Sequence, residues 1–135
     1  MELQVMDFVG PLIGALGFVL LMSLIREPAR QRFNAVFVGG AAGAYVAGGF
    51  GVWELTYVVV GAYVAYLGLK SYRFIGIAWL MHTGWDLLHH FYGNPIWPFM
   101  ETSSLGCAIL DAAIALWFLM EAPSVFDGSL RRRLS

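Results

Sequence analysis

The residues of this chain that are best able to do chemistry lie together in one apolar segment. The chain has three histidines, and all of them fall in the stretch WLMHTGWDLLHHFYGNPIWPF (79–99), at His82, His89 and His90, with Asp86 among them. Imidazole nitrogens and carboxylate oxygens are ligands of zinc, and also of iron or manganese with more oxygen ligands. The stretch therefore predicts a divalent metal site with His82, Asp86, His89 and His90 as candidate ligands.

Helical spacing puts these side chains on one face. An α-helix turns by about 100° per residue, so the four residues share an arc about 100° wide, with Trp79 beside them. Asp86 lies one turn from each of His82, His89 and His90, at the spacings that let side chains on a helix meet. A one-ion site therefore centres on Asp86, and in a two-ion site Asp86 bridges the ions.

The segment that follows offers further members of the site. Ser103, Cys107 and Asp111 recur every four residues, which places them on one side of a second helix. Counting inward from the connection between the two helices puts Asp111 at the depth of His82. We expect Asp111 to be a metal ligand or a general base. The residues expected to line the pocket are Glu54, Trp79, Ser103 and Cys107.

Composition indicates a membrane protein. Of the 135 residues, 59% are hydrophobic and 13% are charged, and the mean hydropathy is +0.70, whereas soluble domains carry about 25% charged residues. A membrane-spanning helix needs about 20 mostly apolar residues. Five segments come close to this length, at about 5–25, 33–53, 54–69, 74–92 and 103–121. We expect one all-α domain (1–135), a polytopic bundle of five transmembrane helices in the cell membrane.

The charged residues predict the orientation of these helices. All eight basic residues fall on one side of a five-helix bundle, namely Arg26, Arg30, Arg32, Lys70, Arg73 and Arg131 to Arg133. The other side carries the acids Glu2, Asp7, Glu54 and Glu101. Because short cytoplasmic loops are rich in Lys and Arg, we expect the N-terminus outside and residues 122–135 inside as a cytoplasmic tail. The acidic start MELQVMD predicts that the first helix is retained, since signal peptides open with basic residues.

Glycines in the second predicted helix indicate close contact with a neighbour. Its sequence VGGAAGAYVAGGFG (38–51) has glycines at positions 39, 43, 48, 49 and 51. Small residues let transmembrane helices approach one another closely. We expect this segment to pack inside the bundle or to join copies in a homo-oligomer, with membrane lipid as a second partner. The formal net charge of −1 predicts no nucleic-acid partner.

Two aspartates inside a membrane need compensation. An Asp at the centre of a transmembrane helix costs about 2.5 to 3.5 kcal/mol on insertion scales, so Asp86 and Asp111 together cost about 5 to 7 kcal/mol. A bound metal ion, a proton-handling or ion-coupled site, and hydrogen bonds that only join helices are three ways to offset this cost. The residues leave all three interpretations open.

The stretch AWLMHTGWDLLHHFYGNPIWPFMETSSLGCAILDA (78–112) resembles a family of small uncharacterised integral membrane proteins, catalogued only as a domain of unknown function. The resemblance extends over most of the chain. It implies an integral membrane protein and carries no activity with it.

The function predicted from the residues is therefore a metal-dependent membrane enzyme. We expect a hydrolase that acts on a lipid or other hydrophobic substrate, with Asp86 and Asp111 as the catalytic carboxylates. The alternative is a small transporter, channel or proton-relay subunit that uses the same histidines and aspartates.

Overall fold

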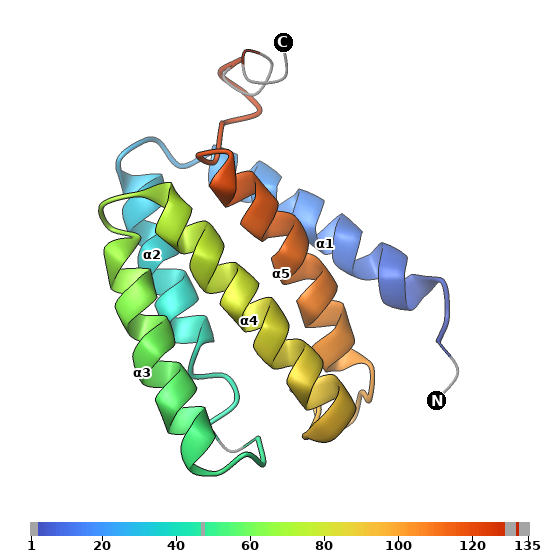
Figure 1. Ribbon diagram of the computed structural model, residues 1–135. Helices are drawn as coiled ribbons and strands as arrows, with labels where there is room; N and C mark the ends of the chain where they lie inside the picture. The colour runs from blue at the N-terminus through green and yellow to red at the C-terminus, as the bar shows by residue number, and fades with distance from the viewer. Residues whose placement is uncertain (1–2, 47, 129–131, 133–135) are drawn as a thin grey trace.

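A computed structural model describes residues 3–46, 48–128 and 132, which form five helices (Figure 1). The helices are α1 (Met6–Ser23), α2 (Ala29–Ala41), α3 (Val52–Leu67), α4 (Tyr72–Tyr92) and α5 (Ser103–Leu119). Within this part of the chain, β structure is limited to an isolated bridge between Trp97 and Met100. The expected all-α class with five helices is confirmed.

The helices run alternately in opposite directions (Figure 1). α4 packs against α2, α3 and α5, and α1 packs against α5. The α1–α2 and α3–α4 connections and the chain after α5 lie at one end, which we call the basic end (Figure 1). Its described basic residues are Arg26, Arg30, Arg32, Lys70, Arg73 and Arg132. Residues 42–46, 48–51 and 93–102 form the other end, which we call the loop end. Glu2, Arg131 and Arg133 lie outside the described residues.

Helix α1 is the helix, among those described, that is long and apolar enough to cross a membrane by length and composition. Only 17% of its 18 residues are buried inside the protein. Helices α3 and α5 are also apolar but have 16 and 17 residues. Most of the apolar surface of α1 is therefore not buried against other described residues, which is typical of a surface that contacts lipid or a partner.

The predicted helix at 33–53 is wrong in its extent. The structure has α2 at Ala29–Ala41, and residues 42–46 and 48–51 lie outside the helices. Glycine lowers the helix propensity of this segment, and further along it Gly49 and Gly51 adopt φ angles of 111° and 59°, which glycine reaches without steric cost. Tyr45 and Gly48 of this segment make hydrogen bonds to Ser104 of α5 and to Asn94, next to the end of α4.

Small residues bring α2 and α3 close together within one chain. A Cβ atom on Gly61 of α3 would lie 3.1 Å from the Cβ of Ala42, and one on Gly39 of α2 would lie 3.4 Å from the Cβ of Ala65. At these distances, a side chain larger than hydrogen at either glycine would crowd the neighbouring helix. The packing expected for the glycines of this segment is therefore present at Gly39, and Gly61 of α3 meets Ala42 from the other side.

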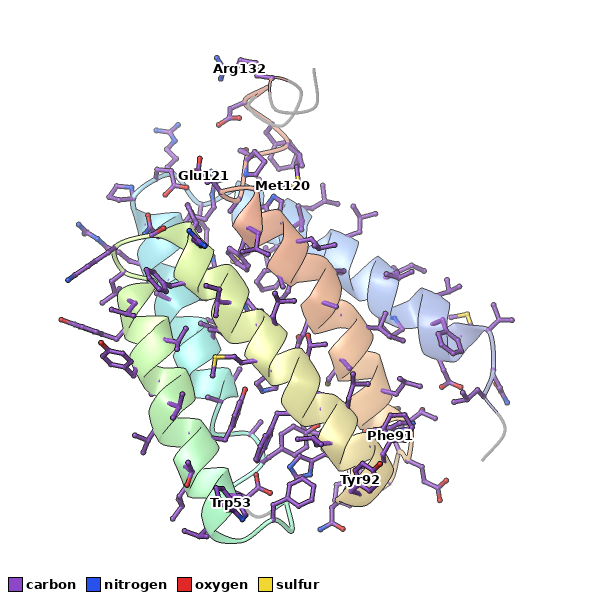
Figure 2. All side chains as sticks on the ribbon, in the orientation of Figure 1. Trp53, Phe91, Tyr92, Met120, Glu121 and Arg132 are labelled. Carbon is purple, nitrogen blue, oxygen red and sulfur yellow. The ribbon has the colours of Figure 1, made fainter. Side chains whose placement is uncertain are left out.

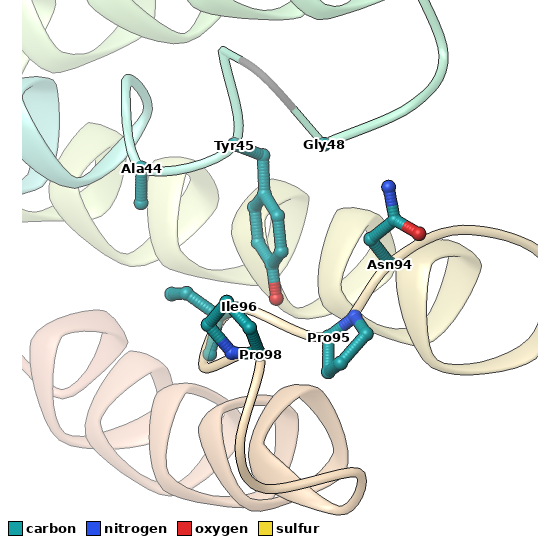
Figure 3. A pocket seen from close by; sticks show the side chains of 7 residues that line it. All are labelled: Ala44, Tyr45, Gly48, Asn94, Pro95, Ile96 and Pro98. Atoms are coloured by element: carbon teal, nitrogen blue, oxygen red, sulfur yellow. The ribbon is translucent and has the colours of Figure 1, made fainter.

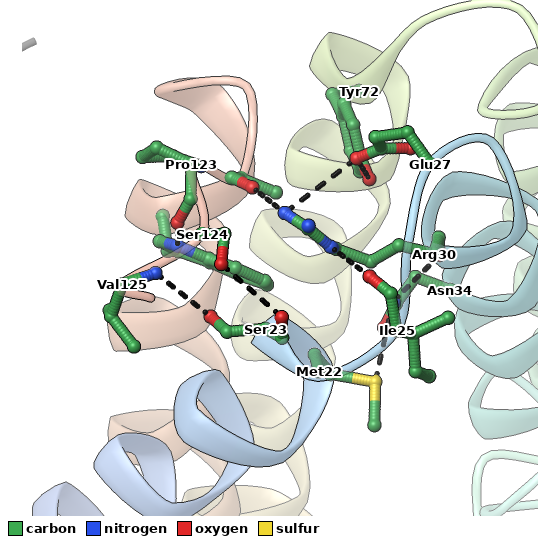
Figure 4. A network of polar contacts seen from close by, with 12 residues as sticks. Met22, Ser23, Ile25, Glu27, Arg30, Asn34, Tyr72, Pro123, Ser124 and Val125 are labelled. Carbon is green, nitrogen blue, oxygen red and sulfur yellow. Dashed lines mark hydrogen bonds and ion pairs between the residues drawn. The ribbon is translucent and has the colours of Figure 1, made fainter. Parts of the chain in front are cut away.

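The first residues after α5 are packed against the basic end (Figure 4). The Ser124 hydroxyl donates to the carbonyl of Ser23 at 3.2 Å, and the Val125 amide donates to the Ser23 hydroxyl at 3.3 Å. The Arg30 guanidinium donates to the Ala122 carbonyl at 2.6 Å. The beginning of the expected tail is thus hydrogen-bonded to the end of α1 and to the start of α2.

Candidate functional site

Helix α4 turns three ionisable side chains into the protein. His82, Asp86 and His89 are 3%, 0% and 0% exposed, whereas Leu80 and Leu88 are each 43% exposed. A helix on the surface of a soluble protein has the opposite arrangement, with its apolar stripe inside. The polar stripe predicted from spacing is therefore the buried face of α4.

His82 joins two buried aspartates. Its Nδ1 atom lies 2.9 Å from Oδ2 of Asp111 on α5 and 3.2 Å from Oδ2 of Asp86 on α4. One ligand atom from each of the three residues falls within 4.8 Å of the others. We call these three residues the carboxylate–histidine group. It is a buried cluster that could hold a metal ion.

The second nitrogen of His82 determines what the first one can do. Nε2 lies 2.9 Å from the carbonyl oxygen of Ala41 at the end of α2. A carbonyl only accepts hydrogen bonds, so Nε2 must carry a proton. If the ring is neutral, Nδ1 then has no proton and carries a lone pair. That lone pair would face two carboxylate oxygens. Attraction requires a proton between Nδ1 and a carboxyl oxygen, carried by either atom, or a metal ion among the three ligand atoms.

Asp86 has an oxygen to spare. Its Oδ1 atom is buried and has no hydrogen-bond partner among the described residues. Buried polar atoms are nearly always partnered in folded proteins, by protein, water or ions. Three protein ligands with further acceptor capacity resemble the catalytic class of metal sites, which keep a position open for water or substrate.

A second buried pair lies nearer the loop end. Glu54, at the start of α3, is 1% exposed and its Oε1 lies 3.2 Å from Nε2 of His89. The same carboxylate accepts hydrogen bonds from the Phe50 amide at 3.1 Å and the Trp85 indole at 3.0 Å. We call this the Glu54–His89 pair. Glu54 was expected to line the pocket, and the structure places it in the interior as the acceptor for three donors.

Tyr45 is a site residue that sequence reasoning missed. Its ring stacks on His89, with centroids 3.9 Å apart and planes inclined by 7°. Its hydroxyl donates to the buried Ser104 hydroxyl at 2.8 Å, and Ser104 in turn accepts from the amide of Ile96 at 3.1 Å. Tyr45 falls in a glycine-rich segment that reads as continuous helix, so no periodic signal distinguished it.

The remaining candidates are dispersed. His90 is half-buried, and its Nδ1 has no partner among the described residues. Ser103 accepts from the Trp97 amide at 3.0 Å and so anchors the connection between α4 and α5. Trp79 packs edge-on against His82, with ring centroids 5.8 Å apart. Cys107 lines a separate hollow of about 310 Å³ between α1 and α5.

The expected four-residue ligand set on α4 is thus not brought together. His82 and Asp86 meet Asp111, while His89 pairs with Glu54. The reason is the length of the stripe, because His82 and His89 lie seven residues apart, about 10.5 Å along α4, and so meet different neighbouring residues. The one helix-external ligand that spacing placed at the depth of His82, Asp111, is in the group.

A cavity of about 480 Å³ opens at the loop end (Figure 3). Its lining residues are Ala44, Tyr45, Gly48, Asn94, Pro95, Ile96 and Pro98. The backbone N–H of Asn94 donates a hydrogen bond to the backbone carbonyl of Gly48 at 3.2 Å, which joins the two walls of the cavity. Tyr45 belongs both to this cavity and to the wall of the buried site.

Comparison with known proteins assigns the chain to a family. Residues 6–124 match the family described as "Family of unknown function (DUF6010)", so the chain belongs to that family. No curated protein and no solved structure matches the chain. The resemblance to an uncharacterised family is confirmed.

Proposed function

We propose that the protein is a multi-pass membrane protein with its basic end in the cytoplasm. Large apolar side chains are exposed along every helix, for example Leu16 at 59%, Val36 at 71%, Val59 at 69% and Leu116 at 62%. Contiguous apolar surface on this scale is typical of contact with lipid or a partner. Helix lengths from 16 to 21 residues in α1, α3, α4 and α5 correspond to about 24 to 32 Å at 1.5 Å per residue, close to a hydrocarbon layer of about 30 Å.

Aromatic residues and charges support this orientation. Trp53, Phe91 and Tyr92 point outward at the loop end and are 65%, 67% and 79% exposed (Figure 2). Trp and Tyr are enriched at the membrane–water interface. The described basic residues gather at the opposite end, as expected for cytoplasmic loops. Helix α2 is too short to span alone, and residues 42–46 and 48–51 continue its path to the loop end outside any helix.

Within this setting, we propose that the carboxylate–histidine group binds a divalent metal ion and hydrolyses an ester or amide. The observation that carries the proposal is the meeting of two buried carboxylates at one nitrogen of His82, at 2.9 and 3.2 Å. One histidine and two carboxylates suit zinc, manganese or iron. A divalent ion at this point offsets the two negative charges and supplies Lewis acidity for hydrolysis.

The reaction places specific demands on the group. The oxygen of a water molecule attacks the carbonyl carbon, the bond from that carbon to the leaving oxygen or nitrogen breaks, and the water proton moves to the leaving group. Asp111 and Asp86 are the carboxylates that would carry that proton. His82, held through Nε2 by the Ala41 carbonyl, would offer its remaining nitrogen as a ligand to the ion.

The test is metal content by mass spectrometry on protein purified in detergent. Wild type is expected to hold about one zinc, iron or manganese ion per chain, in keeping with one three-ligand site. Asp86→Ala is expected to lose it. His90→Ala is the matched control, because His90 lies outside the carboxylate–histidine group, and it should keep the ion. Wild-type protein that holds no metal after reconstitution with each of these ions would refute the metal proposal.

A second function, proton or ion coupling, is supported by the same distances. The contacts of 2.9 and 3.2 Å are also those of an N–H group shared between two carboxylates. Buried Asp and His residues in membrane helices mark proton relays. Proteoliposomes separate the two proposals. A proton or ion flux that depends on Asp86 without bound metal supports the relay, and metal-dependent turnover without flux supports the enzyme.

A further inference from the structure

The cavity at the loop end is positioned to lead to the carboxylate–histidine group. Its two walls come from residues 44, 45 and 48 and from residues 94–96 and 98, which are far apart in sequence (Figure 3). Its volume of about 480 Å³ lies within the range of small-molecule sites, about 300 to 1,000 Å³. The aromatic residues at this end place the cavity at the depth of the outer membrane interface.

Tyr45 is the residue that separates the cavity from the buried group. One face of its ring covers His89, with centroids 3.9 Å apart, and the ring also lies 6.1 Å from that of His82. Its phenol is near enough to Asp86 to interact with that carboxylate. The hydroxyl bond to Ser104 holds the ring in place. Rotation of this one side chain would join the cavity to the group.

The lining favours an uncharged ligand. None of the seven lining residues carries a charge, and Asn94 contributes an amide that can donate and accept hydrogen bonds. Below the cavity lie the buried carboxylates of Glu54, Asp86 and Asp111. An anionic headgroup would meet no basic side chain among the seven lining residues, and the described basic residues lie at the far end of the bundle.

We propose that this cavity binds the polar end of a neutral lipid ester or amide, with Tyr45 as the gate to the carboxylate–histidine group. The apolar side chains of Pro95, Ile96 and Pro98 contact the first carbons of the acyl chain. Asn94 hydrogen-bonds the polar end. The inference rests on the proposed hydrolytic function and names the substrate class and the route of access for that site.

Photo-crosslinking in phosphatidylcholine vesicles tests the inference without requiring turnover. The probe is a monoacylglycerol with a diazirine close to its ester, and the control is the fatty acid with the diazirine on the same carbon. Mass spectrometry of peptides is expected to find the monoacylglycerol on residues 44–48 and 94–98, and much less of the anionic fatty acid there. Labelling confined to the hollow between α1 and α5, or equal labelling by both probes, would overturn the proposal.

Matched variants sharpen the result. Ala44→Trp puts a large ring into the cavity from an exposed position and is expected to lower labelling at residues 94–98 about tenfold, because the site is then filled. Leu12→Trp, on the exposed face of α1, should leave labelling unchanged. Equal labelling of the two variants contradicts the cavity as the binding site.

Metal content measured on the same samples separates this inference from the proposed function. Labelling at the cavity in protein that binds no metal retains the lipid site and refutes the hydrolase. Bound metal with labelling elsewhere retains the metal centre and refutes the cavity as its access route.

Discussion

Two buried polar clusters, one at the basic end and one near the middle of α4 and α5, differ in the balance of their donors and acceptors. At the basic end, Arg30 is 5% exposed, and its guanidinium donates to the carbonyls of Ile25 at 2.9 Å and Ala122 at 2.6 Å (Figure 4). Glu27 lies 3.6 Å from the same guanidinium and accepts a hydrogen bond from Tyr72 at 2.5 Å. One cation here meets several acceptors, which satisfies its charge and joins three segments of the chain.

The carboxylate–histidine group has the opposite imbalance. Asp86 and Asp111 share one nitrogen of His82, and Oδ1 of Asp86 has no described partner. Such a cluster needs an added proton or a metal ion to offset the charges of its carboxylates. Because both clusters are buried, burial alone does not identify a functional site. An excess of acceptors that the fold leaves uncompensated is the more specific sign.

Replacing Asp86 should have the largest effect and should act on metal binding alone. Asp86→Asn keeps the shape of the side chain and removes the charge, so we expect metal affinity to fall more than about 100-fold, beyond the usual effect of residues that only support a ligand. In metal-free protein the free energy of unfolding should stay equal or rise, because one buried charge is gone; with the ion bound, the wild type gains further stability that the variant lacks. Isothermal titration with Zn²⁺ and unfolding in SDS measure the two quantities. Unfolding at lower SDS concentrations than wild type with unchanged affinity would make the group structural, like the Arg30 cluster.

Replacing Arg30 should have the reverse pattern. Arg30→Met is expected to lower the free energy of unfolding by about 3 kcal/mol, because the carbonyls of Ile25 and Ala122 lose a charged donor. Metal content should not change. Arg32→Met is the matched control, since Arg32 is exposed and surface changes are usually within about 0.5 kcal/mol. Loss of metal in Arg30→Met at full stability would break the comparison.

A glycine beside the Glu54–His89 pair provides a smaller, steric test. A Cβ at Gly48 would lie 2.4 Å from Cε1 of His89, so Gly48→Ala must displace the ring and should cost about 2 kcal/mol. Gly40→Ala is the control, because a Cβ there meets nothing within 4 Å and should stabilise α2 by up to about 1 kcal/mol. Unfolding in SDS compares the two variants. Equal stability of both would mean that His89 has room to move.

The smallest effect should come from Glu54→Gln. The amide keeps one acceptor oxygen and turns an N–H group toward the donors that the carboxylate accepted, so we expect a loss of about 1 kcal/mol. The fluorescence of Trp85 should shift, since its indole donates to Glu54 at 3.0 Å. Metal content should be unchanged, which would separate the Glu54–His89 pair from the metal ligands. Loss of metal in this variant would join the two clusters into one site.

The sequence was sufficient to predict much of the fold and part of the site. Apolar stretches and their polar breaks located α1, α3, α4 and α5 to within about three residues, the usual uncertainty of helix ends. Spacing alone paired His82 with Asp86 and placed Asp111 at matching depth. It failed at residues 42–51, because helix periodicity does not show where glycines will adopt positive φ angles. That failure hid Tyr45 and the cavity beside it.

By itself, the sequence determined the helical class, the polar face of α4 and the separation of basic residues from the histidines and buried acids. These features depend on local periodicity and composition, which need no knowledge of neighbours. Only the tertiary structure decided which residues the two histidines contact. His82 contacts Asp111 and the carbonyl of Ala41, and His89 contacts Glu54. The physical reason is that a buried polar atom is satisfied by whichever partner the packing brings within about 3 Å. Those partners lie up to 41 residues away, where helical spacing gives no information.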